Sequence, residues 1–331
     1  MGFRADSDRC PGPRRKGDEI AVTVPVRVTD GVRASCAPGD VHRPIFVIGT
    51  GRSGTTLFFQ MLCFHPDLAW FSTYGNFLYR SSWPALLSRV RDLPGIDRLM
   101  RPDARYAPKP AESYGILDHL TERLFTAPRR LEASDATPLI AERFRERVRA
   151  YLRLQGKPRF ANKHTGFART RFIRAIFPDA RFIHVYRDGR AVANSLVGVD
   201  WWRELDSWGW GQMRPEYAEE YERSGKNRLV LAAISWKTLM DEIEDETREL
   251  GSETLMRVRY DNLVNDLRPS LESALRFAEL PGRPLFWRRV EQHAVHDLDT
   301  NWRRKLEPAQ RELLEKSLAE HLQKYGFTAR P

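Results

Sequence analysis

A glycine-rich turn between a short apolar run and a helical pattern restricts the fold of this chain more than any other feature. Residues 44–48 read Pro-Ile-Phe-Val-Ile, which is typical of a buried strand, and residues 55–64 have the spacing of a helix. Gly-Thr-Gly-Arg-Ser-Gly stands between them, at 49–54. Glycines let backbone N–H groups converge, and a helix N-terminus adds partial positive charge, so this turn is predicted to bind an anion. Further donors of the turn are Arg52, Ser53, Thr55 and Thr56.

The rest of the chain repeats this alternation of short apolar runs and helical segments. Short buried strands separated by helices favour a parallel sheet that is covered on both faces. We therefore predict an α/β fold with three layers, P-loop-like, with a central parallel sheet flanked by helices. Further strands are expected at 159–163, 181–186 and 254–259, and helices at 84–100, 111–125, 138–154, 169–177, 191–197, 229–249 and 308–325.

Composition divides the chain into a leader and a globular part. Residues 1–42 are rich in Arg, Pro, Gly and Asp and are expected to be a flexible leader, although the apolar patch at 20–28 could add an edge strand. Residues 43–331 are expected to form a single domain. The sequence has no apolar run like that of a signal peptide and no apolar stretch of the roughly 20 residues that a membrane span needs. Both observations indicate a cytoplasmic protein. Three cysteines without metal-ligand spacing argue against a metal site and fit a reducing compartment.

The net charge of +10 indicates an anionic partner. Nucleic acid, an acidic membrane surface and a phosphorylated cofactor all meet that description. Lysines and arginines are mixed with acidic residues throughout, and no nucleic-acid-reading motif is present, so we do not expect a nucleic-acid partner.

Comparison with the Walker A loop, G-x-x-x-x-G-K-[ST], separates two classes of enzyme. Gly49 and Gly54 match its glycines, but Thr55 stands where the lysine is required. Kinases and nucleoside-triphosphate hydrolases depend on that lysine, so its absence counts against a P-loop phosphotransferase. The less favoured interpretation of the same residues is a glycine turn with a purely structural role.

A second anion site is expected after the strand at 181–186. Arg187 ends that strand, where side chains of an open α/β sheet point into the ligand crevice, and Ser195 follows eight residues later in the next helix. Separately, Arg187 could pair with Asp188 and Ser195 could bond to its own helix. Two anion sites along one sheet favour a nucleotide phosphorylated at two positions.

These two motifs together resemble those of PAPS-dependent sulfotransferases, which use 3′-phosphoadenosine 5′-phosphosulfate (PAPS). The stretch GTGRSGTT resembles the 5′-phosphosulfate loop in the form with arginine that bacterial and tyrosylprotein sulfotransferases have, and the Arg-to-Ser spacing resembles the 3′-phosphate motif. The resemblance covers most of 44–327 and implies transfer of a sulfuryl group from PAPS to a hydroxyl or amine, without a metal. It assigns the 5′-phosphosulfate to Arg52, Ser53, Gly54, Thr55 and Thr56, and the 3′-phosphate to Arg187 and Ser195.

Two weaker matches lie nearer the C-terminus. Tyr260, in Val-Arg-Tyr-Asp-Asn-Leu, resembles a family tyrosine that contacts the nucleotide, and a core tyrosine is the alternative. The basic run at 301–306 resembles a loop over the 3′-phosphate, from which Arg303 and Lys305 are carried over, and a solvated basic surface is the alternative.

Catalysis needs cations at the leaving oxygen and a base for the acceptor. By analogy with phosphoryl transfer, Arg52 would stabilise the leaving group. Lys163 would do the same, because it resembles a lysine or histidine that family members place on this strand, and a surface lysine is the alternative. Glu112 and His164 are the candidate bases. Glu112 is preferred because neighbouring strand residues face opposite sides and Lys163 would face the site. The family's glutamate after a His-Pro-Asp turn is missing, because 70–76 contain no carboxylate.

Four tryptophans, Trp201, Trp202, Trp208 and Trp210, follow the second motif and would form either an acceptor pocket or core. A P-loop kinase, a nucleic-acid-binding protein and a catalytically silent nucleotide-binding protein remain as alternatives. The acceptor could be a carbohydrate, a lipid, a peptide or a small metabolite.

Overall fold

A computed structural model of the 331-residue chain describes residues 41–93, 107–293 and 300–327. Residues 1–40, including the patch at 20–28, lie outside these ranges. The division into a leader, 1–42, and one domain, 43–331, therefore stays a prediction.

A parallel five-stranded sheet occupies the centre of the described residues, with strand order β2-β3-β1-β4-β5. Every neighbouring pair is parallel. The central strand β1 is completely buried, and its Val47 lies level with Lys163 on one side and with Ile183 on the other. The strands are β1 (Ile45–Ile48), β2 (Leu68–Trp70), β3 (Arg159–Lys163), β4 (Arg181–Tyr186) and β5 (Leu255–Arg259).

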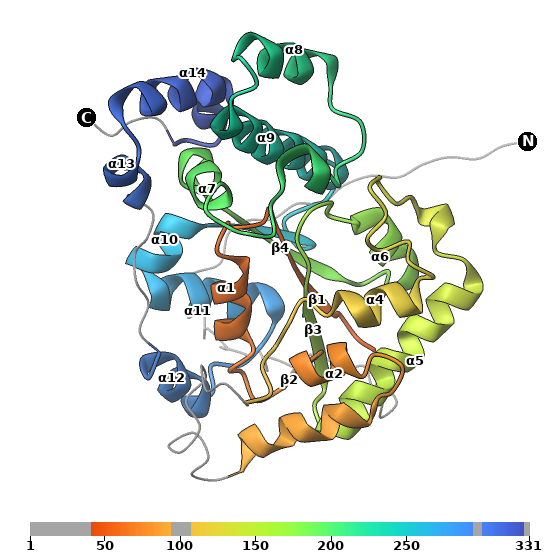
Figure 1. Cartoon of the computed structure of the whole chain (residues 1–331). Helices are drawn as coiled ribbons and strands as arrows, with labels where there is room; N and C mark the ends of the chain where they lie inside the picture. Colours follow the sequence, from red (N-terminus) through yellow and green to blue (C-terminus); the bar gives the residue numbers. More distant parts are fainter. Residues whose placement is uncertain (1–40, 94–106, 294–299, 328–331) are drawn as a thin grey trace, which may run out of the picture. The chain divides into compact units, whose positions relative to one another are not determined.

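Helices cover both faces of this sheet, as Figure 1 shows. Alternate residues of β1 enter different cores, because successive strand side chains point to opposite faces. Phe46 packs with α4 (Tyr114–Leu120), α5 (Pro138–Gln155) and α6 (Thr170–Ile176). Val47 packs with α1 (Thr55–Leu62), α11 (Leu267–Ala278) and α12 (Pro284–Glu291). The predicted three-layer α/β fold is confirmed.

A third apolar cluster lies beyond the end of β4. It joins α7 (Gly189–Leu196), α8 (Pro215–Arg223), α9 (Arg228–Thr247) and α14 (Pro308–Lys324). Helix α9 is buried along most of its length, and Trp236 on it contacts Gly189 of α7. This cluster fixes α7, the helix that begins two residues after Arg187 and carries Ser195.

Several predicted elements differ from the structure in extent. The helix expected at 84–100 is a 3-10 helix, η1 (Trp83–Asp92), and residues 94–100 lie outside the described ranges. The helix expected at 111–125 is limited to α4. No described helix is both long enough and apolar enough to cross a lipid bilayer. The remaining short elements are α2 (Thr73–Phe77), η2 (Ala133–Asp135), η3 (Glu204–Ser207), α10 (Tyr260–Asn265) and α13 (Asn301–Lys305).

Candidate functional site

The glycine-rich turn connects β1 to α1 at the carboxyl edge of the sheet. The Ser53 hydroxyl is buried and hydrogen-bonded to the Thr50 hydroxyl, while Arg52 and Thr56 are exposed. Arg52 has a φ of 67° and Gly54, which caps α1, a φ of 84°. The left-handed conformation is unfavourable for a residue with a side chain, so the turn holds Arg52 in a strained backbone state.

Close approaches by other elements explain two of the three glycines. A Cβ atom on Gly54 would lie 2.2 Å from Cδ2 of Tyr260, and one on Gly49 would lie 2.3 Å from the carbonyl oxygen of Val185 on β4. Gly51 has open space where its Cβ would be, with nothing within 4 Å. The ring of Tyr260 therefore lies directly against the turn, which puts this tyrosine at the site.

The structure brings the two phosphate motifs into contact. Arg52 donates from Nε to the Ser195 hydroxyl at 2.9 Å, and Arg187 donates from Nη1 to the Arg52 carbonyl at 3.3 Å. The Arg187 guanidinium lies over the Tyr260 ring, 4.3 Å from its centroid. Arg187, Ser195, Arg52, Tyr260 and Gly54 thus form one contiguous cluster, which we call the two-loop cluster.

Asp188, the alternative partner for Arg187, is engaged elsewhere. Arg190 donates to both of its carboxylate oxygens, at 3.0 Å and 2.7 Å, and Asp188 also accepts from the Arg190 backbone N–H at 2.8 Å as the cap of α7. This pair is buried, and the Arg190 guanidinium lies over the Trp302 ring. The pair fixes the start of α7 rather than neutralising Arg187.

A second group forms where β3 ends. Lys163 donates from Nζ to the Thr56 hydroxyl at 2.6 Å and pairs with Oε1 of Glu112 at 2.7 Å. Burial lowers the pKa of Lys163 below its usual range, while Glu112 opposes that shift. The Thr165 hydroxyl donates to the same Glu112 oxygen at 3.2 Å. A cation and a carboxylate therefore meet at the first turn of α1.

His164 lies on the other side of the sheet. Its ring is packed against Phe125, 5.1 Å between centroids, and its Nε2 donates to the Ala168 carbonyl at 2.9 Å. Burial lowers the pKa of His164 to about 4. A neutral, enclosed imidazole is poorly placed to take a proton from an acceptor, so the geometry favours Glu112 over His164 as the base.

A cavity of about 510 Å³ joins the turn to the Lys163 group. Arg52, Thr55, Thr56, Lys163 and Glu112 lie in its lining, and aromatic rings complete the wall. The rings are those of Tyr114, Phe125, Phe167, Trp201, Trp210 and Trp236.

The four tryptophans between residues 201 and 210 lie in different environments. Trp201 and Trp210 line the cavity, whereas Trp202 is buried in the cluster around α9. Trp208 packs against that cluster and donates from Nε1 to the Gly211 carbonyl at 2.9 Å. Two of the four tryptophans therefore line the cavity and two belong to the core, and the acceptor pocket stays a prediction.

Arg303 and Lys305 lie on α13, whose Trp302 is buried against the helix that carries Ser195. Both cations are exposed, and Arg303 lies over the ring of Trp302, 5.5 Å from its centroid. The structure places them beside α7, and their role at the 3′-phosphate stays a prediction.

Sequence reasoning missed Tyr114, Thr165 and Trp236. The Tyr114 hydroxyl donates to the Thr165 carbonyl at 3.0 Å and accepts from the Thr165 N–H at 3.0 Å, which ties α4 to the segment after β3. Thr165 stands two residues beyond Lys163, so the alternation of strand side chains was the signal that could have found it. Trp236 gives no such signal, because its helix is buried along most of its length and no single face of it stands out in the sequence.

Two solved structures of other proteins share the fold described above. Sulfotransferase STF9 from Mycobacterium avium is 18% identical with a TM-score of 0.52, over 86% of this chain and 77% of that one. STF1 from Mycobacterium tuberculosis H37Rv is 15% identical with a TM-score of 0.51, over 85% and 77%. At such identities these structures show the shared fold alone. A search of curated protein sequences found no match.

The family comparison covers most of the chain. The model described as "Sulfotransferase family" matches residues 44–284, which include both phosphate motifs, Lys163 and Tyr260. It ends before α13, so Arg303 and Lys305 lie outside the match. The chain belongs to the sulfotransferase family.

Proposed function

We propose that this protein transfers the sulfuryl group of PAPS to a hydroxyl or amine of an acceptor. The observation that carries the proposal is the contact between the two phosphate motifs, Arg52 with Ser195 and Arg187 with the Arg52 carbonyl. Such a cluster offers anion-binding groups from two strands of one sheet, which suits a ligand with two separated phosphorylated positions.

The residues present fit such a donor chemically. We assign the 5′-phosphosulfate to Arg52, Ser53, Gly54, Thr55 and Thr56, which supply a guanidinium, hydroxyls and the N-terminus of α1. We assign the 3′-phosphate to Arg187 and Ser195, with Tyr260 beside Arg187.

Lys163 would serve in place of the lysine that a P-loop phosphotransferase carries within its phosphate-binding loop. Thr55 occupies the Walker lysine position, and the ammonium of Lys163 arrives instead from β3, 2.6 Å from the Thr56 hydroxyl. This difference supports a sulfotransferase over a kinase, because the cation is held by a neighbouring strand and paired with Glu112.

Different residues of the chain contribute to different parts of an in-line transfer. Bound PAPS supplies the sulfuryl group. Glu112 takes the proton of the acceptor hydroxyl or amine as that atom bonds to sulfur, and the sulfur–oxygen bond to the phosphate breaks. Lys163 and Arg52 stabilise the negative charge left on the phosphate oxygen of adenosine 3′,5′-bisphosphate. The aromatic side of the cavity holds the acceptor and excludes water.

The test is release of adenosine 3′,5′-bisphosphate from PAPS in the presence of a panel of phenols, alcohols and amines. We expect release that depends on an added acceptor, and a loss of about hundredfold or more in Glu112→Gln with nucleotide binding retained. The matched control is Glu132→Gln, an exposed carboxylate paired with Arg171. Phosphoryl transfer from ATP, or an unchanged rate in Glu112→Gln, would contradict the proposal.

A further inference from the structure

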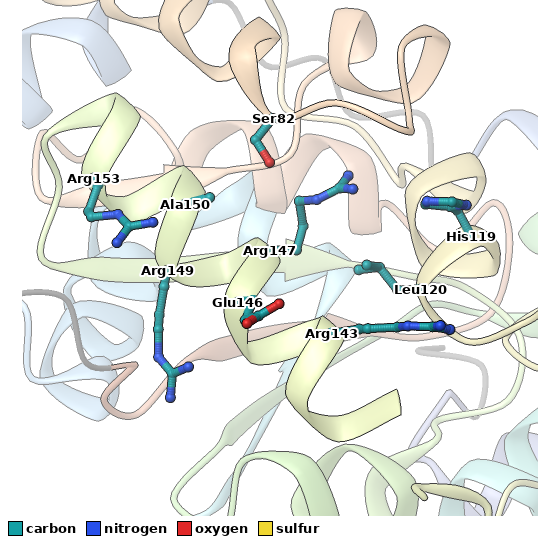
Figure 2. A pocket seen from close by; sticks show the side chains of 9 residues that line it. All are labelled: Ser82, His119, Leu120, Arg143, Glu146, Arg147, Arg149, Ala150 and Arg153. Atoms are coloured by element: carbon teal, nitrogen blue, oxygen red, sulfur yellow. The ribbon is translucent and has the colours of Figure 1, made fainter. Parts of the chain in front are cut away.

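A groove lined by arginines lies outside the catalytic cavity, along α5. Its volume is about 720 Å³, and Figure 2 shows four guanidinium groups spread along the helix, with Ser82 and His119 beside it. The opposite side of α5 packs into the core through Phe144 and Val148. The four arginines are Arg143, Arg147, Arg149 and Arg153.

Local partners leave this groove positively charged. Arg147 donates to the carbonyls of Tyr79, at 2.6 Å, and Arg80, at 3.3 Å. These acceptors are uncharged backbone oxygens. Arg143 pairs with Glu122 at 2.9 Å and Arg149 pairs with Glu142 at 2.8 Å. The side chains of these two pairs are 32–61% exposed, and such pairs are weak and easily exchanged for another anion. In the described lining of the groove, Glu146 is the acidic residue set against the four arginines.

The pKa of His119 reflects the positive charge of the neighbouring arginines. Its pKa lies below the usual range because of partial burial and because Arg147, Arg80 and Arg143 oppose a further positive charge. The residue is exposed, so the effect of the arginines extends to the open side of the groove. An anion there would compete with the exposed carboxylates of Glu122 and Glu142 for Arg143 and Arg149.

The spacing of the arginines identifies an extended ligand. Arg143 and Arg153 are ten residues apart on one helix, which corresponds to about 15 Å at the helical rise. A single phosphate or sulfate would contact one end of this row. A chain that carries an anionic group at intervals would contact all of it.

The other lining residues narrow the class of chain. Leu120 and Ala150 are the apolar members, whereas Ser82, His119 and Glu146 offer donors and acceptors for hydroxyl groups. A protein partner is usually anchored by several aromatic and apolar side chains, and a single-stranded nucleic acid by stacking on aromatic rings. Leu120 is buried and Ala150 is small, and the described lining contains no Phe, Tyr or Trp. We propose that this groove binds an anionic oligosaccharide, through sulfate or carboxylate groups on successive sugars.

The groove shares a helix with the catalytic cavity. Tyr114 at the start of α4 lines the cavity, and His119 near its end lines the groove, about 7.5 Å further along the helix. The inference concerns binding alone and holds whether or not the cavity transfers a sulfuryl group.

The experiment is calorimetric titration of the full chain with a heparin hexasaccharide. The groove variant is Arg143→Gln/Arg153→Gln, which removes the two ends of the row, both exposed. The control variant, Arg174→Gln/Arg276→Gln, makes the same change of charge on exposed positions of α6 and α11. We expect the groove variant to weaken binding about tenfold or more and the control variant less than about twofold. A heparin disaccharide, too short for the row, should bind much more weakly than the hexasaccharide.

Four results would overturn the inference. They are no binding of the hexasaccharide by the wild-type chain, equal weakening in both double variants, competition by saturating adenosine 3′,5′-bisphosphate, and tighter binding of polyglutamate or a single-stranded oligonucleotide through the same arginines. No binding would mean that the groove is not a site, and equal weakening would mean general charge attraction. Competition by the bisphosphate would place the ligand at the two-loop cluster, and tighter binding of another polyanion would change the class of ligand.

Discussion

Replacing Gly54 with alanine tests the contact between the phosphate turn and Tyr260. The new Cβ would lie 2.2 Å from Cδ2 and 2.6 Å from Cε2 of the tyrosine ring, and the backbone there has a φ of 84°. The ring has little freedom to withdraw, because Tyr260 is buried and Arg187 lies over it at 4.3 Å. The substitution should therefore distort the turn.

Two separate costs contribute to the expected destabilisation. A left-handed alanine costs about 1–2 kcal/mol. Overlap with a packed side chain costs about 1–3 kcal/mol. We expect Gly54→Ala to lower the free energy of unfolding by about 2–5 kcal/mol and to weaken binding of adenosine 3′,5′-bisphosphate at the same time.

Urea denaturation measures the first effect, and a second glycine of the same turn is the matched control. Gly51→Ala places its Cβ in open space and should change stability by less than about 0.5 kcal/mol. In a Tyr260→Ala background, Gly54→Ala should retain only the backbone cost of about 1–2 kcal/mol. Equal costs at Gly51 and Gly54, or an unchanged cost without the tyrosine ring, would refute this account of the turn.

Two further predictions concern pH. Burial lowers the pKa of His164 to about 4 and that of His184 to about 3, so below pH 6.5 the unfolded chain binds more protons than the native one. Urea denaturation should show stability falling by roughly 2 kcal/mol per histidine from pH 7 to pH 5, and equal stability at both values would exclude buried neutral rings. Burial raises the pKa of Glu246 to about 7, so between pH 4.5 and 7 the native chain binds more protons and stability falls as pH rises. Glu246→Gln, which can still accept from the Thr170 N–H, should exceed the wild type in stability by about 3 kcal/mol at pH 8 and by less than about 1 kcal/mol at pH 5, whereas the same difference at both values would contradict the assignment.

The sequence predicted the parts of the fold whose signals are local. Strands β1 and β4 are mostly apolar, whereas β3 and β5 contain only two and three apolar residues. Each strand is followed by a turn or a helix, and parallel strands put these at one edge of the sheet. That rule is why the expected proximity of Arg52 and Arg187 could be argued from residues 135 apart.

Other features depend on contacts that no local pattern carries. Strand β2 has three residues, too few for an alternation to be recognised. Trp201 and Trp202 are neighbours of one type, yet Trp201 lines the cavity and Trp202 is buried in the cluster around α9. The pairing of Lys163 with Glu112 joins β3 to the segment before α4, and only the packed fold shows it.

The contact of Tyr260 with Gly54 is of the same kind. Positions 54 and 260 each had an independent interpretation, a turn glycine and a nucleotide-contacting or core tyrosine. The structure shows that they are one feature, because the ring fills the space that a side chain at position 54 would occupy.

The central claim is that the two-loop cluster takes a nucleotide phosphorylated at both the 3′ and 5′ positions. Calorimetric titration with adenosine 3′,5′-bisphosphate, beside ATP and ADP, in the wild type, in Arg187→Ala and in the control Arg174→Ala measures this directly. The account predicts micromolar binding of the bisphosphate, much weaker binding of ATP, and a loss confined to Arg187→Ala. Preference for ATP, or bisphosphate binding that is unchanged in Arg187→Ala, would contradict it.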